Sequence, residues 1–167
     1  MIEKARELIE QLKLEKHPEG GYYSEIFRSE EKIIKGLPER YSGERYICTS
    51  IYFLLSGNDF SAFHRLNSDE IWHFYTGAAL DIYVIGKNKE LTVHTIGNLP
   101  AQGESFQVVI KKGQWFAAEV RDKNSFALVG CTVAPGFDFK DFELGKRDVL
   151  SDEFPLHKDI IARLTSA

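Results

Sequence analysis

The stretch GNDFSAFHRLNSDEIWHFYTG, residues 57–77, predicts two β-strands joined by a short polar turn at residues 67–69. Alternate residues of a strand share one face. On the first strand these are Phe60, Ala62, His64 and Leu66, and on the second they are Glu70, Trp72 and Phe74. If both faces line one interior, an imidazole and a carboxylate point into an apolar, aromatic-walled cavity. Such a combination is typical of a binding or catalytic site.

His64 and Glu70 are therefore the candidate catalytic residues. Imidazole titrates near neutral pH, and burial raises the pKa of a carboxylic acid, so two such groups can transfer a proton on a bound molecule. The alternative is a structural pair, in which His64 hydrogen-bonds Glu70 inside a filled barrel.

The spacing of this stretch resembles the first motif of the cupin superfamily, G-x5-H-x-H-x3,4-E-x6-G. Gly57, His64, Glu70 and Gly77 follow it, although the first interval is one residue longer. Three further segments, HPEGGYY at 17–23, DEIWHFY at 69–75 and VAPGF at 133–137, resemble the single-domain cupin family long described as a domain of unknown function. The resemblance implies one all-β domain over residues 1–167, a cupin-type jelly-roll barrel or sandwich with short helices near both termini.

Cupins usually hold a metal ion through three histidines and a glutamate. In this chain Leu66 replaces the second histidine, and Phe116 stands where the second cupin motif, P-x-G-x-x-H, has its histidine. The two remaining ligands are too few for a tight transition-metal site, which needs three or four. We therefore expect no metal and no other cofactor.

Trp72, Phe74 and Phe116 are candidates to stack on a ligand, although aromatic residues at strand spacing also fill cores. Glu119 faces the cavity only if Trp115 and Ala117 do, whereas the motif alignment favours Phe116 inward. Glu19, beside the Gly20-Gly21 turn, either closes the mouth of the cavity or solvates an edge strand, and the same alternatives hold for Glu25 and Arg28.

The resemblance implies a small-molecule ligand. Cupins that lack the full metal set include sugar-nucleotide epimerases, which implies epimerase- or isomerase-like acid–base chemistry on a carbohydrate-like or sugar-nucleotide ligand. His64 is then the base, and Glu70 orients it or acts as the acid. The alternatives are a non-catalytic metabolite-binding or storage cupin and a metal-dependent dioxygenase-like enzyme.

Composition narrows the class of protein further. The 167 residues carry 21 basic and 25 acidic side chains, a net charge of −4, which argues against a nucleic-acid partner. The sequence has no apolar run of transmembrane length, and its charged start lacks the apolar stretch of a signal peptide, so we expect a cytoplasmic protein with Cys48 and Cys131 as free thiols. Strand 49–55 is apolar on both faces, and we expect a homodimer to cover one of them.

The remaining elements follow from periodicity and turn residues. We expect a helix over 3–14, strands over 22–27, 49–55, 60–66, 70–75, 80–85, 91–96, 106–110, 115–120 and 126–133, and a long loop over 29–45. That loop is either a lid or partner contact or a plain surface excursion. Residues 138–150 are expected to form an extended cover rather than a strand. A last helix should begin at Pro155 and bury Leu156, Ile160, Ile161 and Leu164.

Overall fold

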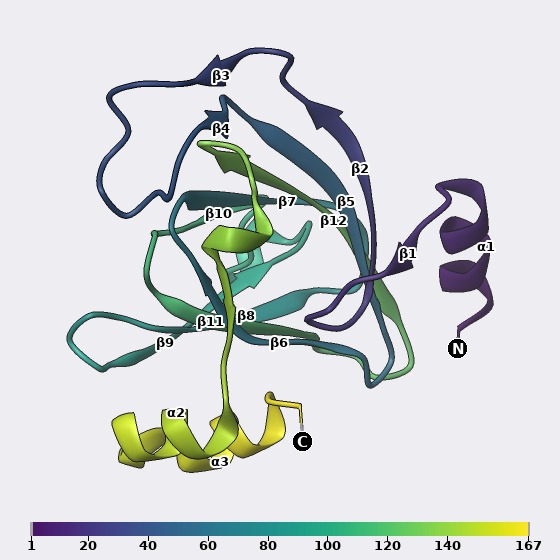
Figure 1. The fold of residues 1–167 in the computed structure, drawn as a ribbon. Helices are drawn as coiled ribbons and strands as arrows, with labels where there is room; N and C mark the ends of the chain where they lie inside the picture. Colours follow the sequence, from purple (N-terminus) through teal and green to yellow (C-terminus); the bar gives the residue numbers. More distant parts are fainter. Residues whose placement is uncertain (1, 167) are drawn as a thin grey trace.

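Short strands of alternating residues pair into two antiparallel sheets, which form the body of the molecule (Figure 1). The structure is a computed structural model that describes residues 2–166. The six-stranded sheet has the order β1 (Glu15–Lys16), β2 (Tyr22–Arg28), β5 (Thr49–Ser56), β12 (Phe126–Ala134), β7 (Asp69–Gly77) and β10 (Gln107–Ile110). The five-stranded sheet has the order β13 (Phe142–Leu144), β6 (Phe60–Leu66), β11 (Trp115–Val120), β8 (Leu80–Ile85) and β9 (Leu91–Ile96).

Each predicted strand is present, within three residues at either end. The predicted all-β fold with helices near both ends is thereby confirmed, and its connectivity is that of a jelly roll. The core between the sheets is built from inward-facing side chains of both, among them Phe53 of β5, Trp72 of β7, Phe116 of β11 and Val129 of β12. Each of these four side chains is at most 1% exposed.

The N-terminal helix covers part of the outer face of the six-stranded sheet. Helix α1 (Glu3–Gln11) brings Ala5, with Leu14 after it, against Leu54 of β5 and Leu128 of β12. The helix ends earlier than the predicted residue 14, and Lys13 adopts a left-handed conformation with φ of 53°. Leu54 is fully buried by this contact, which explains why β5 is apolar on both faces.

The C-terminal segment covers the outer face of the five-stranded sheet, where α2 (Arg147–Glu153) and α3 (Lys158–Arg163) pack side by side (Figure 1). They bury Leu150 and Ile161 against Phe63 and Trp115. The three 3₁₀ helices of the chain that the structure describes are η1 (Pro100–Gln102), η2 (Phe139–Asp141) and η3 (Pro155–His157). No helix within residues 2–166 is both long enough and apolar enough to cross a membrane.

Two predictions for the C-terminal third were wrong. Residues 138–150 contain strand β13, which pairs with β6, and the start of α2, instead of only an extended cover. Pro155 opens the 3₁₀ turn η3 before α3 starts, so Leu156 is rotated off the apolar face and is 91% exposed. Ile161 and Leu164 are buried as expected.

A β-bulge changes the face assignment at the start of β6. The pairing of β6 with β11 shifts register between Phe116↔His64 and Ala118↔Ser61. An extra residue in one strand reverses the alternation beyond it. Phe60, predicted to face the interior, therefore packs with the C-terminal helices, whereas the hydroxyl of Ser61 hydrogen-bonds Glu19.

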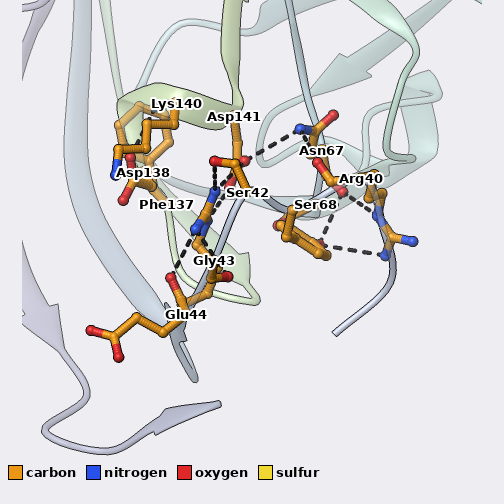
Figure 2. Close-up of polar contacts among 12 residues, drawn as sticks. Arg40, Ser42, Gly43, Glu44, Asn67, Ser68, Phe137, Asp138, Lys140 and Asp141 are labelled. Carbon is orange, nitrogen blue, oxygen red and sulfur yellow. Dashed lines mark hydrogen bonds and ion pairs between the residues drawn. The ribbon is translucent and has the colours of Figure 1, made fainter. Parts of the chain in front are cut away.

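The long loop of residues 29–45 holds the two-residue strand β3 (Lys32–Ile33) and meets β4 (Arg45–Tyr46), with which β3 pairs. Its end is anchored to the segment of residues 137–145, here called the strap, which crosses in front of the sheets (Figure 1). Arg45 binds Asp141 of the strap through two hydrogen bonds, Nε to Oδ2 at 2.6 Å and Nη2 to Oδ1 at 2.8 Å. Figure 2 shows Asp141 also contacting Asn67 of the β6–β7 turn, whose amide donates to Asp141 at 3.2 Å.

We propose that the uncovered part of the outer face of the six-stranded sheet is a homodimer interface. Beyond α1 this face presents Tyr75, 48% exposed, and Val109, 46% exposed, on the adjacent strands β7 and β10. We expect wild-type protein to sediment as a dimer at micromolar concentration and Val109→Glu as a monomer, because a buried charge opposes association. A wild-type monomer at that concentration would contradict the proposal.

Candidate functional site

A cavity of about 430 Å³ lies between the sheets and under the strap. Its walls combine apolar side chains with an unusual number of titratable ones. The lining residues are Glu15, His17, Glu19, Tyr23, Glu25, Arg28, Thr49, Ile51, Phe53, His64, Leu66, Glu70, Cys131, Val133, Phe137, Asp138 and Phe139. Its volume is that of a small-molecule site.

His64 lies on the cavity floor with a defined tautomer. Its Nδ1 is 2.7 Å from the carbonyl oxygen of Ala62, and since a carbonyl can only accept, Nδ1 carries a hydrogen and donates. Nε2 then points at Oε2 of Glu19, 3.2 Å away. The ring packs against Phe116, with centroids 4.0 Å apart, and the side chain is only 2% exposed.

Glu19 reaches His64 because of the turn that follows it. Gly20 has φ of 108°, in the region that favours glycine, and a Cβ there would collide with the carbonyl oxygen of Phe60. This close approach lets the backbone N–H of Ala62 donate to the carbonyl of Glu19 at 2.8 Å and the hydroxyl of Ser61 donate to Oε1 of Glu19 at 2.8 Å. Of the two roles left open for Glu19, solvation of an edge strand is excluded, because this side chain is buried.

Glu19 lies within hydrogen-bonding distance of His64, and burial disfavours the charged forms of both side chains. Burial raises the pKa of Glu19, and burial lowers the pKa of His64 despite the nearby charge of Glu70. Both shifts favour the uncharged arrangement, in which the Glu19 carboxylic acid donates to Nε2 of neutral His64. Transfer of that proton produces a carboxylate–imidazolium pair without any proton leaving the site.

Glu70 lies on the same cavity surface but is not the hydrogen-bond partner of His64. Among residues 2–166, its Oε2 has no hydrogen-bond partner, although the residue is 7% exposed. Burial raises the pKa of Glu70 to about 7; the charge of His64 lowers it, that of Glu19 raises it, and the nearby indole N–H of Trp72, which has no other partner within residues 2–166, lowers it slightly. The ring nitrogens of His64 are directed at Ala62 and Glu19, so the directly hydrogen-bonded His64–Glu70 pair considered from sequence does not form.

The structure places the other predicted ligand-binding residues outside the cavity lining. Trp72 and Phe116 are 1% exposed core residues behind the floor, and Phe74 packs against the same core. Glu119 lies on the opposite face of β11, where Tyr83, Lys123 and Arg163 of α3 bind its carboxylate. The prediction that these residues contact a ligand was therefore wrong. The three aromatic residues pack in the core, and Glu119 forms ion pairs.

Several lining residues were not predicted. His17 lies beside Glu19, with Nδ1 3.4 Å from Oε2, and its ring meets Tyr23 edge to face at 4.6 Å. Cys131, on β12, is buried at the floor, and burial raises the pKa of its thiol well above the ordinary value. Phe137 and Phe139 reach the cavity from the strap. The alternation of residues along β12 could have predicted that Cys131 faces the interior. The positions of Phe137 and Phe139 could not be predicted in this way, because no local sequence pattern indicates where the strap runs.

This chain resembles known proteins in both sequence and fold. A family model described as Cupin superfamily (DUF985) matches residues 6–145. The chain belongs to this family. Among solved structures, a protein from Shewanella oneidensis is 40% identical over 97% of both chains with a TM-score of 0.87. A hypothetical protein from Leishmania major is 32% identical over 98% of this chain and 99% of its own, with a TM-score of 0.89.

More distant cupins share the fold alone. Oxalate decarboxylase from Bacillus subtilis is 13% identical, with a TM-score of 0.55 over 89% of this chain and 36% of the decarboxylase chain. No curated protein matches this cupin in sequence.

The metal site typical of cupins does not fit the residues of this one. Leu66 lines the cavity where the second histidine would stand, and Phe116 packs behind His64. Within residues 2–166, no three His, Cys, Asp or Glu side chains are arranged to hold a metal ion. We expect elemental analysis of purified protein to find no stoichiometric zinc, iron, nickel or manganese. About one metal ion per chain, lost in His64→Ala, would contradict this prediction.

Proposed function

We propose that this cupin binds a small polar molecule between its sheets and transfers a proton on it without a metal ion, with Glu70 as the exchanging group. The observation that carries the proposal is the carboxyl group of Glu70, which is buried at the cavity surface with an unpartnered oxygen. Its pKa of about 7 is suited to general acid–base catalysis, which is most effective when the pKa lies near the working pH.

The Glu19–His64 pair assists Glu70 in this proposed proton transfer. In the sequence-based hypothesis His64 is the base, but its Nε2 is directed at Glu19. When the shared proton moves onto Nε2, the imidazolium of His64 and the carboxylate of Glu19 form together, and the imidazolium favours the ionised Glu70 more than the Glu19 carboxylate opposes it. When the proton returns to Glu19, the charge is removed. The pair thus adjusts the proton affinity of Glu70 as a proton moves to or from the ligand.

The reaction class that fits is proton removal from carbon and its return, as in an isomerase or epimerase. Glu70 as a carboxylate removes the proton, and the carboxylic acid so formed returns it, so one group serves both halves of that reaction. The carbohydrate-like ligand class is inherited from the resemblance to metal-free cupins and stands at the level of the fold. A binding cupin without turnover is the rival, and it would use the same cavity.

Solvent deuterium exchange separates the two functions. A thermal-shift screen of sugars and other polar metabolites would first identify ligands of the wild type. Each ligand would then be incubated with the protein in D₂O, and its C–H signals followed by NMR. We expect deuterium incorporation with the wild type and none with Glu70→Gln, which keeps the shape of the side chain. Binding without exchange in the wild type would show a binding protein instead.

A further inference from the structure

We infer that the ligand of this cavity carries a positive charge, and that it is a small organic ammonium or amidinium compound whose cationic end lies against Glu70. The inference rests on the proposed function in one respect, namely that this cavity is the binding site. It restricts the ligand to cations. Of the two ligand types that the family resemblance implies, it therefore excludes sugar nucleotides, whose phosphates are negatively charged.

The first observation is the charge of the lining. Five carboxyl side chains face the cavity, and Arg28 is the one Lys or Arg among the lining residues that the structure describes. Arg28 is already engaged, with Nε donating to Glu25 at 2.9 Å and Nη1 donating to the carbonyl of Phe137 at 3.3 Å. Even with Glu19 uncharged, Glu15, Glu25 and Asp138 outnumber Arg28, so a phosphate or carboxylate ligand would meet an excess of like charge without a free Lys or Arg to bind it.

The second observation does not depend on the number of charged side chains that line the cavity. Glu70 is 7% exposed and lines the cavity, and its Oε2 is buried without a hydrogen-bond partner within residues 2–166. A buried carboxylate oxygen without a hydrogen bond is unfavourable, and a charged N–H donor is the strongest partner it can have. The imidazole of His64 is committed to Ala62 and Glu19, and the remaining nearby donor, the unpartnered indole N–H of Trp72, is neutral. A cationic ligand would therefore supply a stronger donor than the protein does.

The third observation is the apolar part of the wall. Phe53, Tyr23 and the strap residues Phe137 and Phe139 surround the carboxyl groups. Phe137 and Phe139 pack edge to face with centroids 5.0 Å apart. Aromatic faces attract organic cations and give no advantage to anions. Carboxyl groups and aromatic rings that line one cavity form the kind of environment in which ammonium groups are bound.

The charge of the ligand links binding to pH. Glu70 is faced by His64 from β6, by Glu19 from the turn before β2 and by Cys131 from β12. Since the pKa of Glu70 is raised to about 7, a cation binds best when this carboxyl has lost its proton. The affinity for a cation should therefore rise as pH increases through about 7 and level off above it.

Three probes of one shape test the inference: benzylamine, benzyl alcohol and benzoate, which are cationic, neutral and anionic near pH 8. Isothermal titration of the full-length protein should rank them in that order, with benzylamine tightest. Glu70→Gln should weaken benzylamine by about 10- to 100-fold and change benzyl alcohol by no more than about 2-fold. The matched control is Glu90→Gln, which removes the same charge from an exposed turn and should leave all three unchanged.

Benzoate binding as tightly as benzylamine, or no benzylamine binding at millimolar concentration, would overturn the inference. So would benzylamine binding that Glu70→Gln leaves unchanged. These outcomes are distinct from failure of the proposed function. An anionic ligand that exchanges deuterium in a Glu70-dependent way would overturn the charge assignment and support proton transfer. Cation binding without deuterium exchange into any ligand would support the charge assignment and overturn proton transfer.

Discussion

Glu70→Gln should unfold at a higher temperature than the wild type at pH 8 and at the same temperature below about pH 4.5. The pKa of Glu70 rises from its ordinary value of 4.5 to about 7 in the folded protein, chiefly because burial disfavours the charged form. Between these two values the folded state binds more protons than the unfolded state. The contribution of Glu70 to the stability of the wild type therefore falls as pH rises from 4.5 to about 7, and this contribution is constant outside that window.

The size of the effect follows from the shift. One pKa unit corresponds to about 1.4 kcal/mol. The raised pKa of Glu70 therefore lowers the free energy of unfolding of the wild type by about 3 kcal/mol at pH 8. Glutamine is uncharged at every pH and keeps the shape, so Glu70→Gln avoids this loss. Thermal and urea unfolding from pH 4 to 8 would measure it, with Glu90→Gln as the matched control. If Glu70→Gln were less stable than the wild type by about 1–3 kcal/mol at every pH, Glu70 would instead be part of a structural hydrogen-bond network.

Asp141→Ala should cost about 3–5 kcal/mol of unfolding free energy, because it removes the hydrogen-bonded counter-charge of the buried Arg45 guanidinium and leaves only the electrostatic attraction of Asp138. The Arg45 and Asp141 side chains are 2% and 5% exposed, and two hydrogen bonds join them. Urea unfolding measures the loss. The double variant Arg45→Met/Asp141→Leu should recover most of it, since a buried ion pair can be replaced by apolar side chains at little cost.

The strap carries its own control. Glu143 pairs with Arg65 at 2.7 Å, but the two side chains are 55% and 40% exposed. Glu143→Ala should cost less than about 1 kcal/mol, as is usual for surface ion pairs. Equal losses in Asp141→Ala and Glu143→Ala would show that burial of the Arg45–Asp141 pair is not what fixes the strap.

The strands and half of the site were predictable from sequence, because both depend on local alternation. His64 and Glu70 point into one cavity since each occupies an inward position of a regular strand. Closing the mouth was one of two roles left open for Glu19, but its contact with His64 depends on the Gly20 turn and the bulge in β6, which bring residues 19 and 61–64 together. A bulge adds one residue without any change in composition, so alternation alone misassigned Phe60.

The strap was not predictable for a different reason. Its residues alternate poorly, and its position depends on contacts between distant parts of the chain, namely the pairing of β13 with β6 and an ion pair between residues 96 apart. No window of sequence contains both partners. The same holds for the placement of Glu119, whose orientation follows from ion pairs with Lys123 and with Arg163 of the last helix.

An anchored strap also determines how fast a ligand can exchange. Arg45 and Asp141 hold the strap to the long loop, and β13 holds it to β6, so the backbone over the cavity does not act as a hinged lid. The groups that remain to be displaced at the mouth are side chains, such as the partly exposed Arg28–Glu25 pair. Side-chain rotation takes picoseconds to nanoseconds, whereas loop and lid motions take microseconds or longer. We therefore expect association in a single phase, with a rate that rises linearly with ligand concentration and does not reach a plateau.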